Sequence, residues 1–459
     1  MSANGRHLAH HKMTDAGISQ TSIDVFLHYY DELAAGATGL IAEADITPLP
    51  APLRWDDIEI DDATARDALS QTVVIRLNGG LGTSMGMERA KSLVEVRDGQ
   101  TFLDLICTQV RDVRTKYDVT LPLLFMDSFR TSADTLAAMT QHPDIAVPGL
   151  PLDFTQSREP KIHADDLTPV SWPDDPDLEW CPPGHGDLYA SLLSSGVLDL
   201  LIEAGYRYAT VANSDNLGAT PDPRLAGWFA TSGAPYAVEV ARRTAADRKG
   251  GHLAVRRHDG RLVLRESAQT AEEDKATFAD EKRHAFFNTN NLWLDLHQVR
   301  DTLQERHGIL GLPLIRNVKT VDPTDPNSPQ VYQIETAMGA AVEVFDGAVA
   351  VEVPRTRFLP VKTTDDLLLM RSDAYTLTDG GHLECVTEVA PLVDLDEQHY
   401  RRIADFEERF PCGAPSLRQA TSLTIHGDWT FGADVVCVGE VSLDDDGEPH
   451  ALADGTVLQ

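Results

Sequence analysis

The chain has 459 residues, of which 42% are hydrophobic and 24% are charged, and its formal net charge is −33. A surface this acidic repels nucleic acids and anionic membranes, so we expect neither as a partner. No apolar run approaches the ~20 residues that a membrane-spanning helix needs. At roughly 100–200 residues per domain, the length predicts two to three domains.

The start of the chain and its cysteines both indicate a cytoplasmic protein. Residues 1–12 are polar, carry three histidines (His7, His10 and His11) and lack the apolar core of a signal peptide. We expect this segment to be disordered rather than to bind metal. The cysteines are odd in number and form no C-x-x-C pair, which is typical of unpaired thiols in a reducing cytosol. They are Cys107, Cys181, Cys385, Cys412 and Cys437.

Apolar spacing predicts an alternation of helices and strands along the first half of the chain. An amphipathic helix is expected from Ser22 to about Leu40, followed by a proline-rich connector at residues 44–54. The next predicted elements are a strand at 72–77, a helix through 102–113, a strand at 121–126, a helical stretch at 188–204, and strands at 206–212 and 236–240. Such alternation predicts an α/β domain with a mostly parallel sheet, whose ligands bind at the carboxyl ends of the strands.

The C-terminal part has a different period. Two apolar series recur every six residues: Ile425, Phe431, Cys437 and Leu443, and Leu423, Trp429, Val435 and Val441. A period of six fits the short faces of a parallel β-helix, although a series this short could also arise by chance. The acidic tail from Asp444 is predicted to be a loop.

A glycine-rich turn follows the strand at 72–77. It reads LNGGLGTSMG over residues 77–86 and is followed by Lys91. Glycines let the backbone approach a ligand and present its N–H groups to a phosphate or a base. The dinucleotide pattern would need glycine where Met85 stands, and the Walker pattern would need glycine where Ala90 stands. Neither class fits, which leaves another phosphate cradle or a purely structural turn.

Lysine is rare in this chain, with nine lysines against 30 arginines. A lysine is a compact point charge that can follow a phosphate as its charge moves. Lys91 follows the glycine-rich turn, and Lys362 lies in the segment PVKTTDD. Both are therefore candidates for phosphate contacts, and the alternative for each is a solubilising surface lysine.

Three further segments carry polar groups on turns. The turn at residues 182–187 presents His185, and NSDN at 213–216 presents Asp215 after a strand. A single carboxylate suffices for Mg²⁺ when a nucleotide completes the shell. The third group could bind sugar hydroxyls, and its parts are Lys249–Gly251, Glu266 and Phe287–Asn291. Taken alone, each segment could equally be structural.

In this order, the segments resemble the eukaryotic-type UTP–glucose-1-phosphate uridylyltransferase family. The motifs that carry the resemblance are LNGGLGTSMG (77–86), MDSFRT (126–131), FTQSREP (154–160), PPGHGDLYASL (182–192), NSDNLGAT (213–220), FNTNNLW (287–293) and PRTRFLPVKTTDDLLL (354–369). Asn78 favours the glucose enzyme, because related pyrophosphorylases for other UDP-sugars typically have alanine there. Arg89-Ala90 departs from the glycine-proline pair that is usual before the lysine.

The resemblance implies a nucleotidyltransferase-A type (Rossmann-like) mixed-sheet α/β core. It implies a helical N-terminal segment (1–70), a catalytic domain (71–385) and a C-terminal left-handed parallel β-helix (386–459). The implied reaction is reversible formation of UDP-glucose and pyrophosphate, by in-line attack of glucose 1-phosphate on the α-phosphorus of UTP. A broader UDP-sugar pyrophosphorylase and a non-catalytic UDP-sugar sensor are the alternatives. The resemblance leaves open whether the chain forms a homo-oligomer.

Site residues are likewise implied by the resemblance, position by position. The nucleotide would be bound by Leu77, Gly79, Gly80, Gly82, Lys91, Met126, Gln156, Gly184 and Lys362. The sugar phosphate would be bound by His185, Asn213, Asp215, Gly251, Glu266 and Asn288. Lys91, Lys362 and Asp215 are the expected catalytic residues, and Asp215 is also the expected ligand of the Mg²⁺ cofactor.

Overall fold

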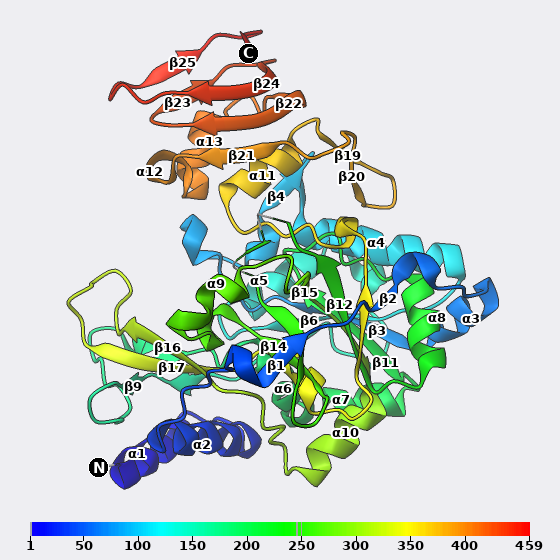
Figure 1. Cartoon of the computed structure of the whole chain (residues 1–459), viewed down its shortest axis with the longest axis vertical. Coiled ribbons are helices and arrows are strands. Elements are labelled where there is room, and N and C mark those ends of the chain that lie inside the picture. The colour runs from blue at the N-terminus through cyan, green and yellow to red at the C-terminus, as the bar shows by residue number, and fades with distance from the viewer. Residues whose placement is uncertain (1, 245–246, 249) are drawn as a thin grey trace.

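A computed structural model describes residues 2–244, 247–248 and 250–459. Its centre is a large sheet (Figure 1) whose main path runs β2–β18–β12–β15–β11–β3–β6–β7. In that order the strands are Leu53–Arg54, Val349–Glu352, Tyr236–Arg242, Phe286–Asp295, Tyr208–Asn213, Thr72–Leu77, Leu123–Asp127 and Asp153–Thr155. β3 is parallel to β6 and β11, whereas β15 is antiparallel to β11 and β12. The sheet is therefore mixed: β11–β3–β6–β7 and β2–β18–β12 are parallel, as predicted, and β15 separates these two parts by pairing antiparallel with both.

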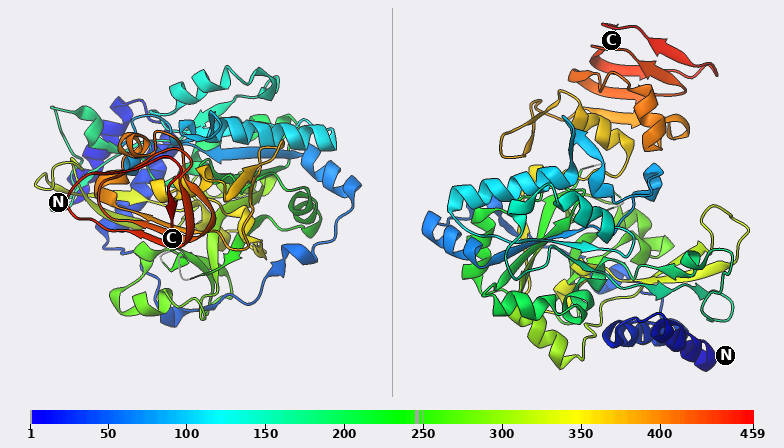
Figure 2. Two further views of the ribbon diagram at one scale, coloured as in Figure 1. Left: turned by 90° about the horizontal axis from the view of Figure 1, so that it is seen from above. Right: turned by 180° about the vertical axis from the view of Figure 1, so that it is seen from behind.

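Helices cover both faces of this sheet (Figures 1 and 2). β3 alternates between the two layers: Val74 packs with α3, α4 and α8, and Val73 and Ile75 pack with α6, α7 and α10. These helices are α3 (Asp62–Ser70), α4 (Phe102–Tyr117), α8 (Pro223–Ser232), α6 (Leu188–Ser194), α7 (Val197–Glu203) and α10 (Leu296–Glu305). The stretch predicted as helical at 188–204 is two helices, because Gly196 takes a left-handed φ of 75° between them.

The N-terminal segment is ordered, which corrects the prediction of a disordered start. Helix α1 (Ser2–Asp15) packs on α2 (Gln20–Ala34), with Ala9 and Met13 fully buried. Lys12 forms an ion pair with Glu179. Apolar periodicity did not predict this helix, because its sequence is mostly polar and only a narrow strip of it is apolar. Helix α2 ends before the predicted Leu40.

The proline-rich connector at 44–54 contains two short strands that the sequence analysis missed. β1 (Ile46–Pro48) pairs with β13 (His252–Arg256), and β2 pairs with β18. Ile46 is buried against Ala254 and Val263. Proline is tolerated in such edge strands, because the missing N–H faces away from the ladder.

The C-terminal segment stacks parallel strands at one end of the molecule (Figures 1 and 2). One ladder runs β21 (Leu392–Leu395), β22 (Ser416–Ile425), β24 (Val436–Leu443) and β26 (Val457–Leu458), and a second pairs β23 (Trp429–Phe431) with β25 (His450–Leu452). Leu423 pairs with Val441 and Ile425 with Leu443. One layer of this stack therefore corresponds to three of the six-residue steps seen in the sequence. β25 and β26 lie in the acidic tail, which corrects the predicted loop.

Smaller elements complete the fold. The remaining helices are α5 (Ser132–Met139), α9 (Lys275–Phe278), α11 (Thr364–Arg371), α12 (Glu397–Tyr400) and α13 (Ile403–Arg409). The remaining strands are β4 (Glu95–Arg97), β5 (Gln100–Thr101), β8 (Glu159–Pro160), β9 (Ile162–His163), β10 (Trp180–Cys181), β14 (Leu262–Arg265), β16 (Ile315–Thr320), β17 (Gln330–Glu335), β19 (Tyr375–Leu377) and β20 (Leu383–Cys385). All five cysteines are unpaired, as predicted. Among the described residues, no helix is long and apolar enough to cross a membrane.

Candidate active site

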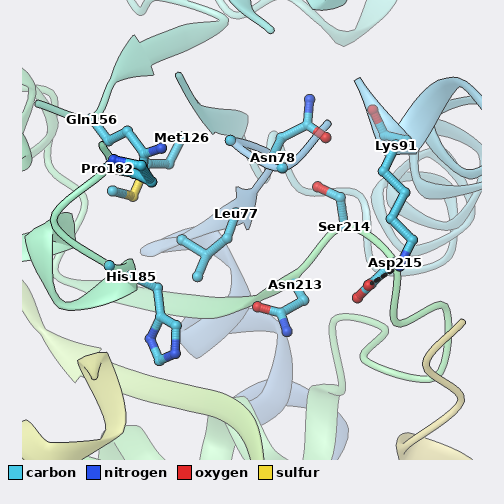
Figure 3. Close-up of a pocket in the computed structure, with 14 residues that line it drawn as sticks. Leu77, Asn78, Lys91, Met126, Gln156, Pro182, His185, Asn213, Ser214 and Asp215 are labelled. Carbon is cyan, nitrogen blue, oxygen red and sulfur yellow. Dashed lines mark hydrogen bonds and ion pairs between the residues drawn. The ribbon is translucent and has the colours of Figure 1, made fainter. Parts of the chain in front are cut away.

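A cavity of about 270 Å³ lies at the carboxyl ends of β3, β6 and β11 (Figure 3). Leu77 is in register with Met126 on β6 and with Asn213 on β11, so three neighbouring parallel strands each end with a lining residue. The predicted site residues that line the cavity are Leu77, Gly79, Gly80, Lys91, Met126, Gln156, Gly184, His185, Asn213 and Asp215. The structure thus brings ten of the predicted residues together at the sheet edge where ligands of α/β proteins bind.

The glycine-rich turn packs directly against the loop after β7. A Cβ atom on Gly79 would lie 2.5 Å from the Nε2 atom of Gln156, so a side chain at this position would displace the Gln156 amide. Gln156 is held from the other side, because its backbone N–H donates to the carbonyl of Asp127 at 2.7 Å. The side chain of Gln156 lines the cavity, and its amide carries the donor and acceptor groups that suit a base.

Two lysines converge on one carboxylate at the edge of the cavity. The Nζ atom of Lys91 lies 2.8 Å from Oδ2 of Asp215 and also donates to the carbonyl of Val361. The Nζ atom of Lys362 lies 3.4 Å from the same oxygen. Lys91 and Asp215 are about 15% exposed, whereas Lys362 is 58% exposed and does not line the cavity. The pair of ammonium groups brings local positive charge to the edge of the cavity.

Gly82 lies behind the cavity wall rather than in it. Its φ is 65°, a left-handed conformation that favours glycine. A Cβ atom there would lie 3.4 Å from Cγ of Lys91, so Gly82 leaves room for the lysine stem. Its place indicates a role in shaping the turn instead of a direct nucleotide contact.

His185 is held as a neutral imidazole. Its Nδ1 atom accepts a hydrogen bond from the backbone N–H of Met338 at 2.9 Å. Removal from solvent and, secondarily, the charge of Lys362 lower the pKa of His185 to about 4. The ring proton is therefore assigned to Nε2, which can donate to a hydroxyl or a phosphate oxygen.

The remaining predicted sugar residues form a second group outside the cavity lining. The carboxylate of Glu266 lies 2.4 Å from where a Cβ atom of Gly251 would be, and the N–H of Asn288 donates to the carbonyl of Gly251 at 2.9 Å. Burial raises the pKa of Glu266. Lys249, in the same predicted group, lies outside the described residues.

A short 3-10 helix at Met338–Glu343 links this second group to the cavity. The missing side chain of Gly339 leaves room for the amide of Asn288, 3.0 Å from its Cβ position. The preceding residue, Met338, holds His185. The two groups of predicted residues are therefore neighbours, joined through two adjacent residues of one element.

Four cavity-lining residues were not predicted as site residues, although three of them lie in the motifs and Ser92 directly follows Lys91. They are Asn78, Ser92, Pro182 and Ser214. The side chain of Asn78 points away from the cavity (Figure 3) and donates to Asp127 at 2.9 Å and Thr135 at 2.8 Å. The hydroxyls of Ser92 and Ser214 are buried and have no hydrogen-bond partner among the described residues. Ser92 and Ser214 could have been predicted as site residues, because each is adjacent in sequence to an expected catalytic residue, Lys91 or Asp215.

Asp127 is the centre of a buried network under the cavity. Its Oδ1 atom accepts hydrogen bonds from Asn78, Thr131 and Thr135 at 2.9–3.0 Å. Its Oδ2 atom is buried and has no partner within the described part of the chain. Burial raises the pKa of Asp127 to about 7. This network ties the start of the glycine-rich turn to the end of β6.

Comparisons with known proteins agree with this geometry. Over residues 23–437 the chain matches the family model described as UTP–glucose-1-phosphate uridylyltransferase. The chain belongs to this family. The Saccharomyces cerevisiae UTP–glucose-1-phosphate uridylyltransferase is 40% identical over 395 residues, which are 85% of this chain and 77% of that protein. The family prediction is therefore confirmed.

Solved structures extend the family match to the fold. The crystal structure of UDP-glucose phosphorylase from Trypanosoma brucei is 43% identical, with a TM-score of 0.91 over 99% of this chain and 98% of that one. A mutant of the Leishmania major UDP-glucose pyrophosphorylase, crystallised in complex with UDP-glucose, is 41% identical, with a TM-score of 0.92 and the same coverage. The mixed α/β core is thus that of UTP–glucose-1-phosphate uridylyltransferases.

Proposed function

We propose that the chain makes UDP-glucose and pyrophosphate from UTP and glucose 1-phosphate, in a reversible reaction. The observation that carries this proposal is the convergence of Lys91 and Lys362 on Asp215, beside a glycine-rich turn at the end of parallel strands. Triphosphate chemistry needs concentrated positive charge at one point, and a chain with a net charge of −33 supplies it here.

The uridine nucleotide would occupy the side of the cavity formed by the turn and the ends of β6 and β7. Leu77 and Met126 offer apolar contact, and the amide of Gln156 can both donate to and accept from a pyrimidine edge. Gly79, Gly80 and Gly184 would let the base and ribose approach the backbone closely. Gly82 would act only by keeping the turn open around Lys91.

The reaction would proceed by in-line attack of a sugar-phosphate oxygen on the α-phosphorus of UTP, with pyrophosphate leaving from the opposite side. A phosphate monoester is already nucleophilic near pH 7, so no general base is required. The protein's work is positioning and charge neutralisation. Phosphate oxygens would compete with Asp215 for the ammonium groups of Lys91 and Lys362, which then offset the repulsion between the two substrates.

Asp215 has the donor chemistry to hold a Mg²⁺ ion. Its Oδ1 atom is buried and has no hydrogen-bond partner in the described chain, so a ligand atom is available. The described residues contain no cluster of three or more candidate ligands. This fits Mg²⁺, which takes one or two protein carboxylates and completes its shell with phosphate and water. When bound, the ion would neutralise developing charge on the phosphates.

Glucose 1-phosphate would lie between the cavity and the second group of residues. His185 and Asn213 line the cavity on that side. Gly251, Glu266 and Asn288 would close around the sugar hydroxyls, for which a carboxylate and an amide are suitable partners. A broader sugar range and a non-catalytic UDP-sugar sensor are the alternatives. The sensor hypothesis gives no reason for two lysine ammonium groups to lie within 3.4 Å of Asp215, the carboxylate proposed to hold Mg²⁺.

We further propose the division into an N-terminal segment (1–70), a catalytic domain (71–385) and a C-terminal domain (386–459). The parallel ladders with an eighteen-residue register support a left-handed parallel β-helix for the last of these. The unpaired cysteines support a cytoplasmic location.

The decisive experiment measures pyrophosphate release from UTP, Mg²⁺ and glucose 1-phosphate, with each omitted in turn. Release that requires all three supports the proposal. No release, together with calorimetric binding of UDP-glucose, would favour the sensor. A panel of sugar 1-phosphates then sets the range, and equal kcat/KM across the panel would exclude a glucose-specific enzyme.

A further inference from the structure

Residues 357–361, which directly precede Lys362, are hydrogen-bonded to the loop that follows β11. Asn216 makes most of the attachment. Its Oδ1 atom accepts from the N–H of Leu359 at 2.8 Å, and its Nδ2 atom donates to the carbonyl of Arg357 at 3.3 Å. The neighbouring N–H of Val361 donates to the carbonyl of Asp215 at 3.1 Å. Lys362 therefore starts from a backbone position set by the loop that carries Asp215.

Close packing reinforces this attachment. A Cβ atom on Gly218 would lie 2.5 Å from the carbonyl oxygen of Thr356, so the two backbones touch. Pro360 also forms an isolated antiparallel bridge with Asn216. The contact between the two segments has no room for a side chain, which fixes their separation.

A buried ion pair is linked to Asn216 through one intervening side chain. Arg357 makes a bidentate contact with Glu239, at 2.7 and 2.8 Å, and the Glu239 side chain is fully buried. Asn291 joins the pair to Asn216, because its Nδ2 donates to Glu239 at 3.1 Å and its Oδ1 accepts from Asn216 at 3.1 Å. Asn216, Asn291, Glu239 and Arg357 are absent from the cavity lining, so none is placed to touch substrate there.

We propose that Asn216, supported by the Glu239–Arg357 pair, is a positioning residue that aims Lys362 at the transferring phosphate. This inference rests on the proposed function. A lysine has a flexible four-carbon stem, and the side chain of Lys362 is 58% exposed, so packing of the side chain itself does little to direct it. Lys362 is also held by its ion pair with Asp215 and by the hydrogen bond from its backbone N–H to Asp366 at 2.6 Å. The backbone at 357–361 sets the position from which the side chain starts, and a displacement of about 1 Å can lower a rate ~100-fold.

The test compares Asn216→Ala with wild type by pyrophosphate release and by calorimetric binding of UDP-glucose. We expect kcat to fall by about 10- to 100-fold while the Kd for UDP-glucose stays within about twofold. Asn216→Ser keeps an oxygen that can accept from Leu359 and should regain part of the lost kcat. Asn327→Ala, at an exposed asparagine that does not line the cavity, is the control and should behave as wild type.

Three results would overturn the inference: a kcat for Asn216→Ala within twofold of wild type, a Kd that weakens in parallel with kcat, or no recovery with serine. The melting temperature of each variant identifies a loss of kcat that follows from unfolding. If wild type itself releases no pyrophosphate, the proposed function fails. An active wild type with parallel losses contradicts the positioning role alone.

A second measurement asks whether Asn216 acts through Lys362. In a Lys362→Ala background the ammonium group that Asn216 would position is absent. Asn216→Ala should then lower kcat by a clearly smaller factor than it does in wild type. Equal factors in the two backgrounds would show that Asn216 acts independently of Lys362.

Discussion

The Nζ atom of Lys362 lies 3.4 Å from the Oδ2 atom of Asp215, although 147 residues separate them in the sequence. Replacing this lysine tests its assignment to the phosphates. We expect Lys362→Ala to lower kcat by about two to four orders of magnitude, because the charge it offers matters most as pyrophosphate leaves. UDP-glucose should still bind, which calorimetry measures. Lys319→Ala, an exposed lysine on β16, is the control, and a normal kcat for Lys362→Ala would contradict the assignment.

Asp215 is expected to be the residue through which Mg²⁺ acts. Asp215→Asn keeps the shape of the side chain but removes the charge that pairs with Lys91 and would bind the ion. Turnover should fall by about three orders of magnitude or more, and the residual rate should no longer respond to Mg²⁺. Titrating Mg²⁺ in the pyrophosphate assay measures both effects. Asp325→Asn, on an exposed turn, serves as the control, and Mg²⁺-dependent turnover by Asp215→Asn would exclude this role.

The motifs of the site could be predicted because each is short and continuous in sequence, and the family resemblance named Leu77, Met126 and Asn213 among its residues. The structure has them at the ends of neighbouring parallel strands, the edge where ligands of α/β domains were expected. The buried pair of Glu239 and Arg357 could not be predicted. Partner choice across 118 residues depends on the packed sheet, and no local pattern encodes it.

Gly79 should tolerate no side chain while Gln156 keeps its place. Gly79→Ala puts a methyl group 2.5 Å from the amide at the movable end of the Gln156 side chain, so we expect the amide to be displaced, stability to fall by about 1 kcal/mol and UDP-glucose binding to weaken. In the double variant Gly79→Ala/Gln156→Ala the obstructing amide is gone. Its free energy of unfolding, measured in urea, should match that of Gln156→Ala alone. A further loss of stability in the double variant would contradict the predicted contact.

His185 should make the folded protein less stable as the pH falls. Its pKa is about 4 in the folded protein, and an unfolded histidine has a pKa of about 6.5. Between these values the unfolded chain binds a proton that the folded protein does not, so the free energy of unfolding decreases from pH 6.5 towards pH 4. His185→Gln can still accept from Met338 and should show a shallower decrease. Equal slopes in urea unfolding would show that His185 is not the group responsible.

Asp127 should have the opposite effect on stability, because its ionisation makes the folded protein less stable as the pH rises. Its pKa is about 7 in the folded protein, against 3.8 for an ordinary aspartate, so between these values the folded protein holds the extra proton. Its contribution to stability is therefore present below about pH 4 and is lost as the pH rises to 7. The asparagine side chain of Asp127→Asn is uncharged at every pH, so this variant should lack this part of the pH dependence of stability. If urea unfolding gives both proteins the same profile from pH 4 to 7, Asp127 is not protonated in the fold.

Missed elements have a common physical cause. The helix α1 and the strands β1, β25 and β26 are short or polar, and each is stabilised by a neighbour rather than by its own pattern. Helix α1 needs α2, and β1 needs the edge that β13 offers. Periodicity reports only apolar faces that are long enough to repeat, so elements of this kind become visible only with the tertiary structure.

The attachment of residues 357–361 to Asn216 also has a consequence for biosynthesis. The ribosome makes β3, β11 and Asp215 well before it reaches Lys362, and contacts of such long sequence separation form late in folding. A nascent chain can therefore complete most of its sheet while its phosphate site still lacks one of its two cations. The phosphate site is complete only once residues 357–362 have been made and have docked on Asn216.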